Sequence, residues 1–493
     1  MDKIFFIFSI WIAKFISLTI SIFRLGQGSN VPGRFALSLK KDLFQHFKIK
    51  NNCKIILITG TNGKSTTCGL LSNILKSTNK KVFYNKSGAN LLSGIASTFC
   101  HYSNLLGALS YDYIVLEVDE ATLPKITREI KANVIAITNL FRDQLDRFGE
   151  LDTTAKLIES GVNNNKDALI FLNADDPRVA FLNIENKRIY YGIATNVKRH
   201  CEEQSDHHDS LVAGSAISKT LGDCRVGANP PPRNDRETLW LSDPEEITTC
   251  PSCKAELTFT HKTLAHLGNY HCNNCNLQRP KIDFSVTRFK TDHLTTNFDI
   301  NFNSSKNNLF LPMIGTFNLY NALCAISIAK TVSNATNLQI QKSFDSYSTV
   351  FGRGEKLTVN KKNAWIYLIK NPTGTTEVLK TLCNLPNARF LIAINDNYAD
   401  GRDVSWLWDA RFDYLRNHKK NIFVSGKRSN DIALRLKYAN INPEQITINE
   451  NIISSLNKCS RSMNTNETLY ILPTYTVLLE LQRQGICKSM PLN

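Results

Sequence analysis

The chain has 493 residues, which at roughly 150 residues per domain indicates about three domains. Hydrophobic residues make up 42% and charged residues 21% of the chain, a balance that excludes a largely disordered protein and a collagen-like fibre. The formal net charge of +16 favours an anionic partner, such as a nucleotide, a nucleic acid, a phospholipid surface or a phosphorylated substrate, although a basic solvated surface gives the same total.

Residues 4–23 form an apolar run that is long enough for a membrane-spanning helix. Lys14 would then lie near the centre of the bilayer, at a cost of ~3 kcal/mol. At 100° per residue the polar side chains share one narrow arc, which consists of Lys3, Lys14, Ser17, Ser21 and Arg24. The pattern favours an amphipathic helix that lies on a membrane or on a partner. A spanning helix is the alternative, since the apolar run offsets the cost of the lysine.

Beyond a glycine-containing break at 26–33, a short helix is expected over residues 37–47. From residue 53 the pattern becomes strand, loop and helix. The expected order is a buried strand at 54–59, a glycine-rich loop at 60–64 and a helix at 65–76, followed by short β-branched strands at 113–118, 133–138 and 168–172. Strands that alternate with helical stretches are typical of a parallel, doubly wound sheet.

Residues 196–240 interrupt this alternation with a proline triplet and no hydrophobic period, so we interpret them as a disordered insertion. Cys201, His207 and His208 within it are explained more simply by a solvated loop than by a metal site. After the insertion we expect a cysteine-rich module at 249–281 and an amphipathic helix at 318–331. Two strands are expected further on, at 364–368 and 390–394. The predicted domains are an N-terminal helix with its lead-in, a central domain and a smaller C-terminal α/β domain, at 1–50, 51–350 and 351–493.

The strongest motif is TGTNGKST at 59–66, between the expected strand and helix. Its glycines let backbone N–H groups converge on phosphate oxygens, and the helix N-terminus adds a favourable dipole. Lys64 would reach the terminal phosphates, and the Ser65 hydroxyl would bind Mg²⁺. Two residues separate the glycines, where the usual phosphate-binding loop has four. The motif predicts a nucleotide site made by Gly60, Thr61, Asn62, Gly63, Lys64, Ser65 and Thr66.

The second motif is Cys250-x2-Cys253-x18-Cys272-x2-Cys275, two Cys-x2-Cys sequences separated by 18 residues. Two such sequences at this spacing place four thiolates tetrahedrally around Zn²⁺ at ~2.3 Å. A closed shell of four thiolates leaves no position for water, so the zinc would be structural. The odd total of thirteen cysteines, without a recognisable cleavable signal, favours reduced thiols over a secreted disulfide scaffold. The predicted zinc ligands are Cys250, Cys253, Cys272 and Cys275.

The third motif is the acidic segment NDNYADGRDVSW at 395–406, directly after an expected strand. Loops at the carboxyl ends of parallel strands are where α/β proteins place their sites. From the residues alone, an ordinary aspartate-rich turn explains this segment as well as a binding site does.

The shortened glycine loop resembles that of the Mur ligase family of ATP-dependent amide-forming enzymes. Glu117, which ends a strand in LEVDE, is similar to the Mg²⁺-binding glutamate of that family. Asn318 and Asn321 in GTFNLYN resemble its adenine-binding segment, with helix capping as the alternative role. Arg353 in FGRGE resembles the arginine that reaches the nucleotide from the C-terminal domain.

The sequence NLFRDQLDRFG at 139–149 also resembles a family stretch, Asn…Asp-His-Leu-Asp-x-His-Gly. Gln144 and Phe148 stand where the family has histidines, so no role of those histidines is carried over. The fold that the resemblance implies is α/β, with a Mur-ligase-type central P-loop domain that has a parallel sheet and an inserted four-cysteine zinc ribbon, followed by a smaller C-terminal α/β domain.

The cysteine module, KNPTG at 370–374 and the acidic segment narrow the resemblance to one branch of the family, the ATP-binding subunits of lipid II isoglutaminyl synthase. It covers about residues 37–478, apart from the insertion. The resemblance implies that ATP phosphorylates the α-carboxylate of D-glutamate in the lipid II stem peptide, and that ammonia attacks the acyl phosphate to give D-isoglutamine. Lys64, Mg²⁺ and Arg353 would offset the charge that develops on the phosphoryl group.

The chain has no recognisable Cys/His glutaminase signature, so the resemblance implies a heterodimer with a separate, GatD-like glutaminase subunit that supplies ammonia. By the same resemblance, Asp403 would orient the catalytic histidine of that subunit. A lipid-linked pyrophosphate substrate suits the basic charge and the N-terminal helix. It also implies a cytoplasmic protein at the inner face of the cytoplasmic membrane.

Two other functions compete with this interpretation. An ordinary ligase of the superfamily would add an amino acid to a UDP-muramyl peptide or glutamate to folate. Too little chain precedes residue 53 to form a UDP-binding domain, which argues against the muramyl version. A zinc-ribbon ATPase that binds nucleic acid is favoured only by charge and the cysteine cluster, and would bind with a steep salt dependence. No nucleic-acid partner is therefore expected.

Overall fold

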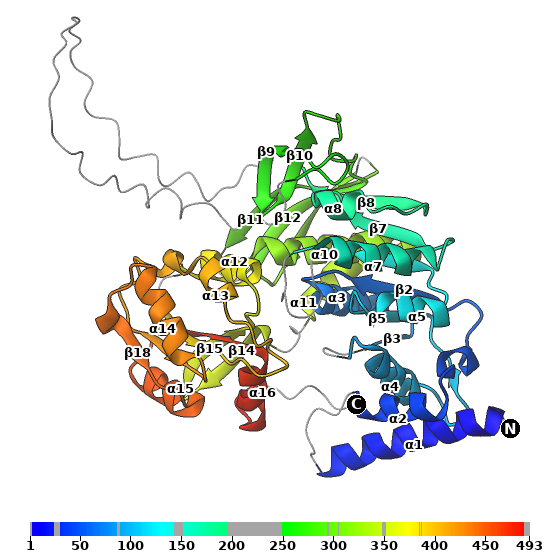
Figure 1. Cartoon of the computed structure of the whole chain (residues 1–493), viewed down its shortest axis with the longest axis horizontal. Coiled ribbons are helices and arrows are strands. Elements are labelled where there is room, and N and C mark those ends of the chain that lie inside the picture. The colour runs from blue at the N-terminus through cyan, green and yellow to red at the C-terminus, as the bar shows by residue number, and fades with distance from the viewer. Residues whose placement is uncertain are drawn as a thin grey trace, which may run out of the picture.

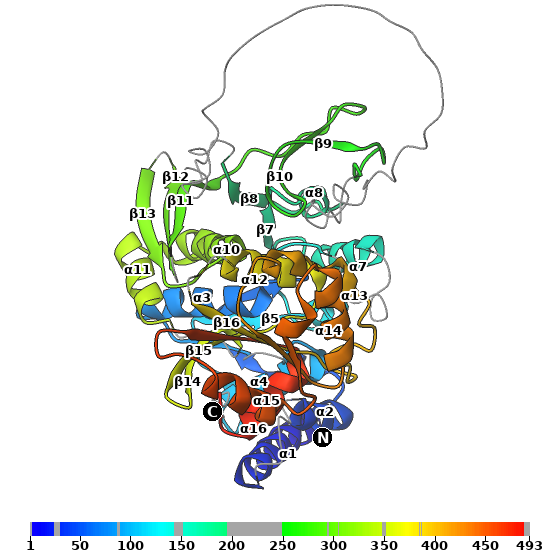
Figure 2. The ribbon, with the colours of Figure 1, turned by 90° about the vertical axis from the view of Figure 1, so that its left-hand side faces the viewer.

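The structure, a computed structural model, describes residues 2–23, 30–85, 89–141, 151–194, 249–292, 295–303, 305–347, 352–383, 385 and 387–487. Two α/β units lie side by side, with a long helix at one end of the molecule and a two-stranded hairpin at the other (Figure 1, Figure 2). The predicted insertion at 196–240 and most of the NLFRDQLDRFG sequence lie outside the described residues.

The larger sheet has nine strands, and all of them come from residues 54–311. They are β2 (Lys54–Thr59), β3 (Val82–Tyr84), β5 (Tyr113–Glu117), β6 (Val134–Ile137), β7 (Leu169–Asn173), β8 (Arg188–Ile193), β11 (Phe284–Asp292), β12 (Thr295–Phe302) and β13 (Ser305–Leu311). Their order across the sheet is β13-β12-β11-β8-β7-β6-β2-β5-β3. Every pair from β3 to β11 is parallel, and the last two pairs are antiparallel.

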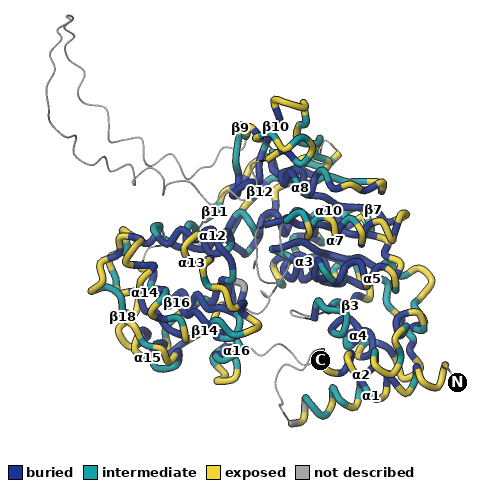
Figure 3. The backbone as a smooth tube through the Cα atoms, viewed as in Figure 1, coloured by how far each residue is buried: buried dark blue, intermediate teal, exposed yellow. Residues whose placement is uncertain are grey.

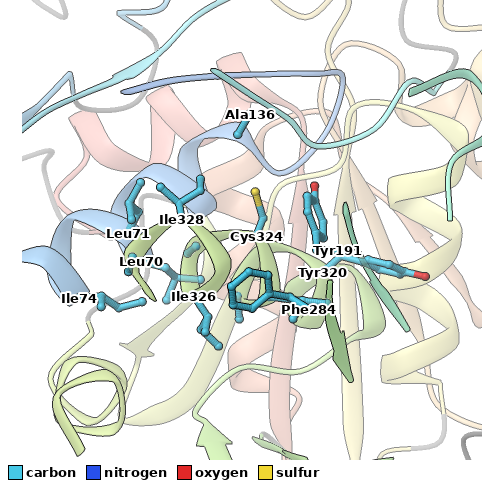
Figure 4. Packing of buried hydrophobic residues seen from close by; sticks show 14 of the residues in the cluster. Leu70, Leu71, Ile74, Ala136, Tyr191, Phe284, Tyr320, Cys324, Ile326 and Ile328 are labelled. Atoms are coloured by element: carbon cyan, nitrogen blue, oxygen red, sulfur yellow. The ribbon is translucent and has the colours of Figure 1, made fainter. Parts of the chain in front are cut away.

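Helices cover both faces of this sheet, because the parallel strands are apolar on both sides. One face is covered by α3 (Lys64–Ser77), α10 (Thr316–Ser333) and α11 (Asn337–Asp345). In that core Leu70, Leu71 and Ile74 of α3 pack beside Ile326 and Ile328 of α10 (Figure 4). The opposite face is covered by α1 (Asp2–Phe23), α2 (Val31–Leu39), α4 (Leu92–Tyr102), α5 (Leu123–Glu129), α7 (Leu151–Asn163) and α8 (Pro177–Ala180).

The smaller sheet has six strands, in the order β14-β15-β19-β16-β17-β18. They are β14 (Arg353–Val359), β15 (Lys362–Tyr367), β16 (Ala388–Ala393), β17 (Ile422–Ser425), β18 (Ile446–Ile448) and β19 (Thr468–Pro473). Only the pair of β14 and β15 is antiparallel. One face packs on α12 (Pro372–Leu382), α13 (Trp406–Asp409) and α14 (Ser429–Tyr438), and the other packs on α15 (Ile452–Arg461) and α16 (Tyr475–Arg483).

Two smaller strand pairs complete the described chain. The hairpin of β9 (Leu257–Leu264) and β10 (Leu267–Cys272) extends beyond the large sheet and carries the cysteine-rich module. Strands β1 (Lys48–Ile49) and β4 (Ala108–Leu109) pair in parallel near the N-terminal helices. Short 3-10 helices occur at η1 (Leu43–His46), η2 (Phe412–Leu415) and η3 (Pro443–Gln445).

The strands expected at 54–59, 113–118, 133–138 and 168–172 correspond to β2, β5, β6 and β7, so the parallel α/β prediction is confirmed. The prediction of a break at 26–33 and a helix over 37–47 is wrong in detail. Helix α2 already begins at Val31 and ends at Leu39, with a 3-10 turn following. Pro32 lies in the first turn of α2, where its missing N–H costs no helical hydrogen bond. The predicted domain limits at 50 and 351 stay predictions.

Helix α1 is part of the globular core along one side. Phe6, Ile10 and Ala13 are buried with residues of β2 and β5. Gly107 has a φ of 78°, and a Cβ atom there would lie 2.4 Å from Cε1 of Phe6. Helix α1 therefore approaches the backbone of the 104–107 turn so closely that only glycine fits.

Replacement of Gly107 by alanine should destabilise the protein by roughly 2–4 kcal/mol, because it adds overpacking against Phe6 to the left-handed backbone strain. Gly485 is a matched control, since its φ is 70° and nothing lies within 4 Å of its added Cβ. Gly485→Ala should cost only about 1 kcal/mol. Denaturant unfolding of both variants measures the difference, and equal losses would show that α1 does not press on Gly107.

Candidate functional site

The glycine loop connects the end of β2 to the start of α3, as the motif predicts. Gly60 has a φ of 120° and Gly63 a φ of 88°, both in a region that favours glycine. A Cβ atom would lie 2.3 Å from Oγ1 of Thr138 at Gly60 and 2.0 Å from Oδ1 of Asn321 at Gly63. The loop is thus closely surrounded by side chains, and it leads into the N-terminus of α3, where an anion is favoured.

The segment after β6 holds the loop in this shape. The backbone N–H of Asn62 donates to Oδ1 of Asn139 at 2.9 Å, and the carbonyl of Asn62 accepts from Oγ1 of Thr138 at 2.7 Å. The hydroxyl of Thr61 donates to the Phe141 carbonyl and accepts from the Phe141 N–H, each at 3.1 Å. The loop is therefore tied to residues 138–141 at both Thr61 and Asn62.

Lys64 is buried at the start of α3, and its ammonium group is fully engaged by the protein. Its Nζ donates to Oε1 of Glu120 at 2.9 Å and to the carbonyl oxygens of Gly60 and Thr61 at 2.5 and 3.3 Å. Burial disfavours the charge, but the Glu120 carboxylate outweighs it and raises the pKa of Lys64 above its ordinary value. A protonated lysine is therefore held at the loop.

Glu117 ends β5 beside the loop and is buried. Its Oε2 atom is buried without a hydrogen-bond partner, whereas its backbone N–H and carbonyl are both bonded to the Asn85 side chain. A buried carboxylate oxygen without a partner is costly unless a cation or a ligand satisfies it. This arrangement fits a Mg²⁺ ion that Ser65, which is also buried here, would share.

The predicted adenine-binding residues lie at the start of α10, against the glycine loop. Asn318 and Asn321 are buried, and Nδ2 of Asn318 donates to the Ile314 carbonyl at 2.8 Å. Asn321 touches Gly63, as described above. Arg353 is the first residue of β14, in the smaller sheet, and its side chain lies outside the described atoms.

The C-terminal unit reaches the glycine loop through Asn371. This residue caps the N-terminus of α12 by accepting from the Gly374 N–H at 2.9 Å, and its Nδ2 donates to Oδ1 of Asn62 at 3.0 Å. Asn371 belongs to the KNPTG sequence at 370–374, to which the sequence alone assigns no contact with the loop. Hence the two α/β units meet at the loop.

The four predicted zinc ligands lie together. Their Sγ atoms are all within 4.8 Å of one another, and the distances are 3.6 Å from Cys250 to Cys275 and 3.5 Å from Cys253 to Cys272. A tetrahedron with metal–sulfur bonds of ~2.3 Å has edges of ~3.8 Å, so the cluster fits a tetrahedral metal. Disulfide bonds, at ~2 Å, are excluded at these distances. Hydrogen bonds from Asn274 and from the Ala255 backbone lower the pKa of Cys253 to about 6, which favours its thiolate.

The cysteine hairpin is fastened to the large sheet by Asp175 and Asp176. Oδ1 of Asp175 accepts from Arg279 at 2.8 Å, and its Oδ2 accepts from the Tyr320 hydroxyl at 2.6 Å. Asp176 caps α8 and accepts from the Leu140 N–H at 2.8 Å. The hairpin tip carries His266, which is buried with its ring centroid 4.6 Å from that of Phe141. The tip therefore packs on the same segment that holds the glycine loop.

Asp403 lies elsewhere, on the exposed loop after β16 in the C-terminal unit. Its Oδ1 accepts from the Ser405 N–H at 2.8 Å. Buried Asp400 supports the loop by accepting from the N–H and hydroxyl of Thr476, and burial raises its pKa. An open cavity of about 470 Å³ adjoins this loop, lined by Asp396, Asn397, Tyr398, Arg402, Lys427 and Arg428.

The structure thus brings together the residues predicted for nucleotide and magnesium binding, except Arg353, whose side chain is not described. Sequence reasoning missed Glu120 and Asn139, which hold Lys64 and the glycine loop. Glu120 is the last residue of LEVDE, three residues after Glu117, and Asn139 is the first residue of NLFRDQLDRFG. Both residues therefore belong to motifs that the sequence already singles out. Their roles depend on how β5 and β6 flank β2, which no local pattern reports.

Comparison with known proteins agrees with this geometry. Residues 58–221 match the family model for the Mur ligase middle domain, and residues 368–478 match the model for the MurT ligase C-terminal domain. The chain is 34% identical over 474 residues to the lipid II isoglutaminyl synthase (glutamine-hydrolyzing) subunit MurT of Streptococcus pneumoniae, which covers 95% of each chain. It is 30% identical over 461 residues to the protein of that name from Staphylococcus aureus strain COL, covering 93% of each.

Solved structures share the fold at low sequence identity. A pseudomurein peptide ligase type C from Methanothermus fervidus superposes with a TM-score of 0.59 at 20% identity, covering 88% of this chain and 79% of that one. MurF ligase from Thermotoga maritima in complex with ADP has a TM-score of 0.57 at 11% identity, covering 92% and 83%. The chain therefore has the Mur ligase fold, and by its similarity along nearly its whole length it belongs to the MurT family.

Proposed function

We propose that this protein is the ATP-binding subunit of a lipid II isoglutaminyl synthase, which amidates the D-glutamate α-carboxylate of the stem peptide during peptidoglycan synthesis. The observation that carries the proposal is the similarity to MurT subunits over 95% of both chains. The buried loop with Lys64, Glu117 and the two α10 asparagines is the matching site for the nucleotide.

The chemistry needs a leaving group on a carboxylate, which is a poor acyl donor. A carboxylate oxygen attacks the γ-phosphorus of ATP, the bond to the β-phosphate oxygen breaks, and ADP leaves, which gives an acyl phosphate. Ammonia then attacks the acyl carbon, expels inorganic phosphate and loses a proton, which gives the amide. Lys64 and Arg353 offset the negative charge on the transferred phosphoryl group. Mg²⁺, held by Ser65 and Glu117, would neutralise phosphate charge when bound. Gly60, Thr61, Asn62, Gly63 and Thr66 line the phosphates, and Asn318 and Asn321 contact the base.

The four cysteines hold a structural Zn²⁺. Four protein thiolates complete a tetrahedral shell, so the metal has no position for a substrate or for water. Two of the sulfurs, those of Cys250 and Cys272, belong to buried residues in the small core of the hairpin, and that core depends on the shell.

Ammonia comes from a glutaminase subunit, with which the chain forms a heterodimer. Asp403 is the residue we assign to that partner's catalytic histidine, and its exposed position on a loop braced by Asp400 supports the assignment. The domain limits predicted above assign this contact to residues 351–493. Such a complex would act in the cytoplasm, at the membrane surface where lipid II is made accessible.

Lys64→Ala should lower the amidation rate at least 10²-fold, because it removes the charge nearest the transferred phosphoryl group. Lys80→Ala, an exposed change beyond the end of α3, is the control and should leave the rate within twofold. The assay measures lipid II amidation by the complex with ATP and glutamine. An unchanged rate in Lys64→Ala would remove the ATP site from residues 60–66.

Cys253→Ser should lower the zinc content and the melting temperature together, by roughly 5–10 °C, because metal binding is folding energy in a closed site. Cys53→Ser, at a half-buried cysteine outside the cluster, should keep the full zinc content. Metal analysis and thermal unfolding of the purified chain test both variants. Zinc loss without loss of stability would rule out a structural role.

Asp403→Asn should lower glutamine-dependent amidation at least ~10²-fold, since the amide no longer orients an imidazole as a carboxylate does. The same variant should keep its rate with free ammonium at high pH, because the glycine loop is untouched. Asp409→Asn, at an exposed acid that ends α13, serves as the control. Equal loss with glutamine and with ammonium would place Asp403 in the ligase site instead.

A further inference from the structure

Helix α1 exposes a continuous row of large apolar side chains along its whole length. They recur at intervals of four and three residues, so they share one side of the helix. Their exposed fractions range from 52% to 72%. We name this row the α1 apolar row; it consists of Ile4, Phe8, Trp11, Phe15, Leu18 and Ile22.

The opposite side of α1 is held by the protein at several points. Phe6, Ile10 and Ala13 are buried in the core that also contains β2 and β5. Lys14 donates from Nζ to the carbonyl oxygens of His101 and Ser103, at 3.0 and 2.8 Å. Helix α1 is therefore not an independent segment, although by length and composition its residues 2–20 are apolar enough to cross a membrane.

A spanning orientation would break these contacts. It would expose the core residues of β2 and β5 that α1 covers, and it would separate the Lys14 ammonium from its two carbonyl acceptors. An in-plane orientation keeps all of them and covers only the α1 apolar row. The geometry is thus that of a helix that lies in the plane of an interface. The side opposite the α1 apolar row is already packed on the protein.

The neighbouring surface extends the same apolar character. Trp11 donates from Nε1 to the Leu105 carbonyl at 3.0 Å, so the exposed Leu105 and Leu106 lie beside the α1 apolar row. Helix α2, which packs beside α1, adds the exposed side chains of Val31 and Phe35. Exposed apolar residues thus come from three adjoining segments at this end of the molecule, where exposed positions run along α1 (Figure 3), and contiguous exposed apolar surface of this kind marks an interaction site.

Basic side chains accompany this patch. Lys3, Arg34 and Lys41 are exposed, and no acid in the described part of the chain forms an ion pair with them. Lys40, by contrast, is paired with Asp2 and Asp42. Lysine and arginine side chains that pair with no acid among the described residues, next to exposed apolar side chains, fit a surface of anionic lipid, whose headgroups and acyl chains satisfy both.

We propose that the α1 apolar row, with Leu105 and Leu106, docks the protein on the surface of an anionic phospholipid bilayer, with α1 in the membrane plane. The inference rests on the proposed function for its purpose, since a lipid-linked substrate is presented at that surface. The occupant is lipid rather than a second copy of the chain, because the same basic residues of a second copy would repel Lys3, Arg34 and Lys41, for which the described residues offer no paired acid. In this pose the β9–β10 hairpin, at the other end of the molecule, points away from the membrane (Figure 1, Figure 2).

The test is binding of the full chain to vesicles of phosphatidylcholine with one third phosphatidylglycerol, measured by sedimentation. The double variant Phe15→Glu, Leu18→Glu should need at least tenfold more lipid for half-maximal binding, because it places two charges in the middle of the row. Leu338→Glu is the control: Leu338 is 66% exposed on α11, outside this patch, and its change should alter binding less than twofold. Equal thermal unfolding of the three proteins shows that the variants fold.

Three results with the purified protein would overturn the proposal, and a fourth result with native membranes would do so too. The first is that the wild-type chain does not bind the vesicles, and the second is that the double variant binds them as well as the wild type does. The third is that light scattering shows a dimer, which the double variant dissociates, and that the chain does not bind vesicles. Resistance of the protein in native membranes to alkaline extraction would mean that α1 spans, which also contradicts an in-plane helix. Vesicle binding requires neither ATP, glutaminase nor lipid II, so its outcome is independent of whether the amidation activity is found.

Discussion

Asn62 is the residue at which the parts of this molecule meet, and the candidate site depends on its hydrogen bonds. Its N–H donates to Asn139, its carbonyl accepts from Thr138 and Asn139, and its side-chain oxygen accepts from Asn371 of the C-terminal unit. A loop with two left-handed glycines has little structure of its own and must be held from outside. The bonds to the segment after β6 hold the loop backbone, and the bond to Asn371 connects the C-terminal unit to the same residue. A change in the position of that unit would therefore act on the loop directly.

The cysteine hairpin acts on the same loop through packing. Its tip carries His266 against Phe141, and the Phe141 backbone is bonded in both directions to the Thr61 hydroxyl. Asp175, just after β7, accepts from Arg279 beyond β10, whereas Asp176 lies 3.5 Å from Nε2 of His266 at the tip and also holds the Leu140 N–H. A hairpin this small buries little apolar surface by itself, so a metal in its cysteine cluster would supply much of the order that the tip needs. A structural metal in the cluster would therefore also support the glycine loop, through the tip of the hairpin.

Much of the fold was predictable, because its signals are local. The run KIILIT followed by TGTNGKST specifies β2, the loop and α3 within two residues, and the spacing of the four cysteines specifies their cluster. Contacts between distant segments were not predictable. Glu120 beside Lys64, Asn371 beside Asn62 and His266 beside Phe141 are separated by 56, 309 and 125 residues along the chain, and their pairing follows from the strand order. The start of α2 was missed for a different reason, since proline and glycine normally indicate a break. Here Pro32 lies in the first turn of α2, and Gly33, which has no side chain, lets the backbone of α2 pack closely against α4.

The N-terminal helix shares its core with the strand that leads to the nucleotide loop. Phe6 and Ile10 of α1 belong to the same cluster of buried residues as Ile55 and Leu57 of β2, and β2 ends where the loop begins. Protein interiors are packed as densely as crystals of small organic molecules. Helix α1 and strand β2 therefore keep a fixed position relative to each other. If α1 rests on a membrane, the height and tilt of the nucleotide loop above the lipid surface are set by this packing and not by a flexible linker. A substrate whose reactive carboxylate stands at a constant distance from its lipid anchor is then met by a site at a constant distance from the same surface.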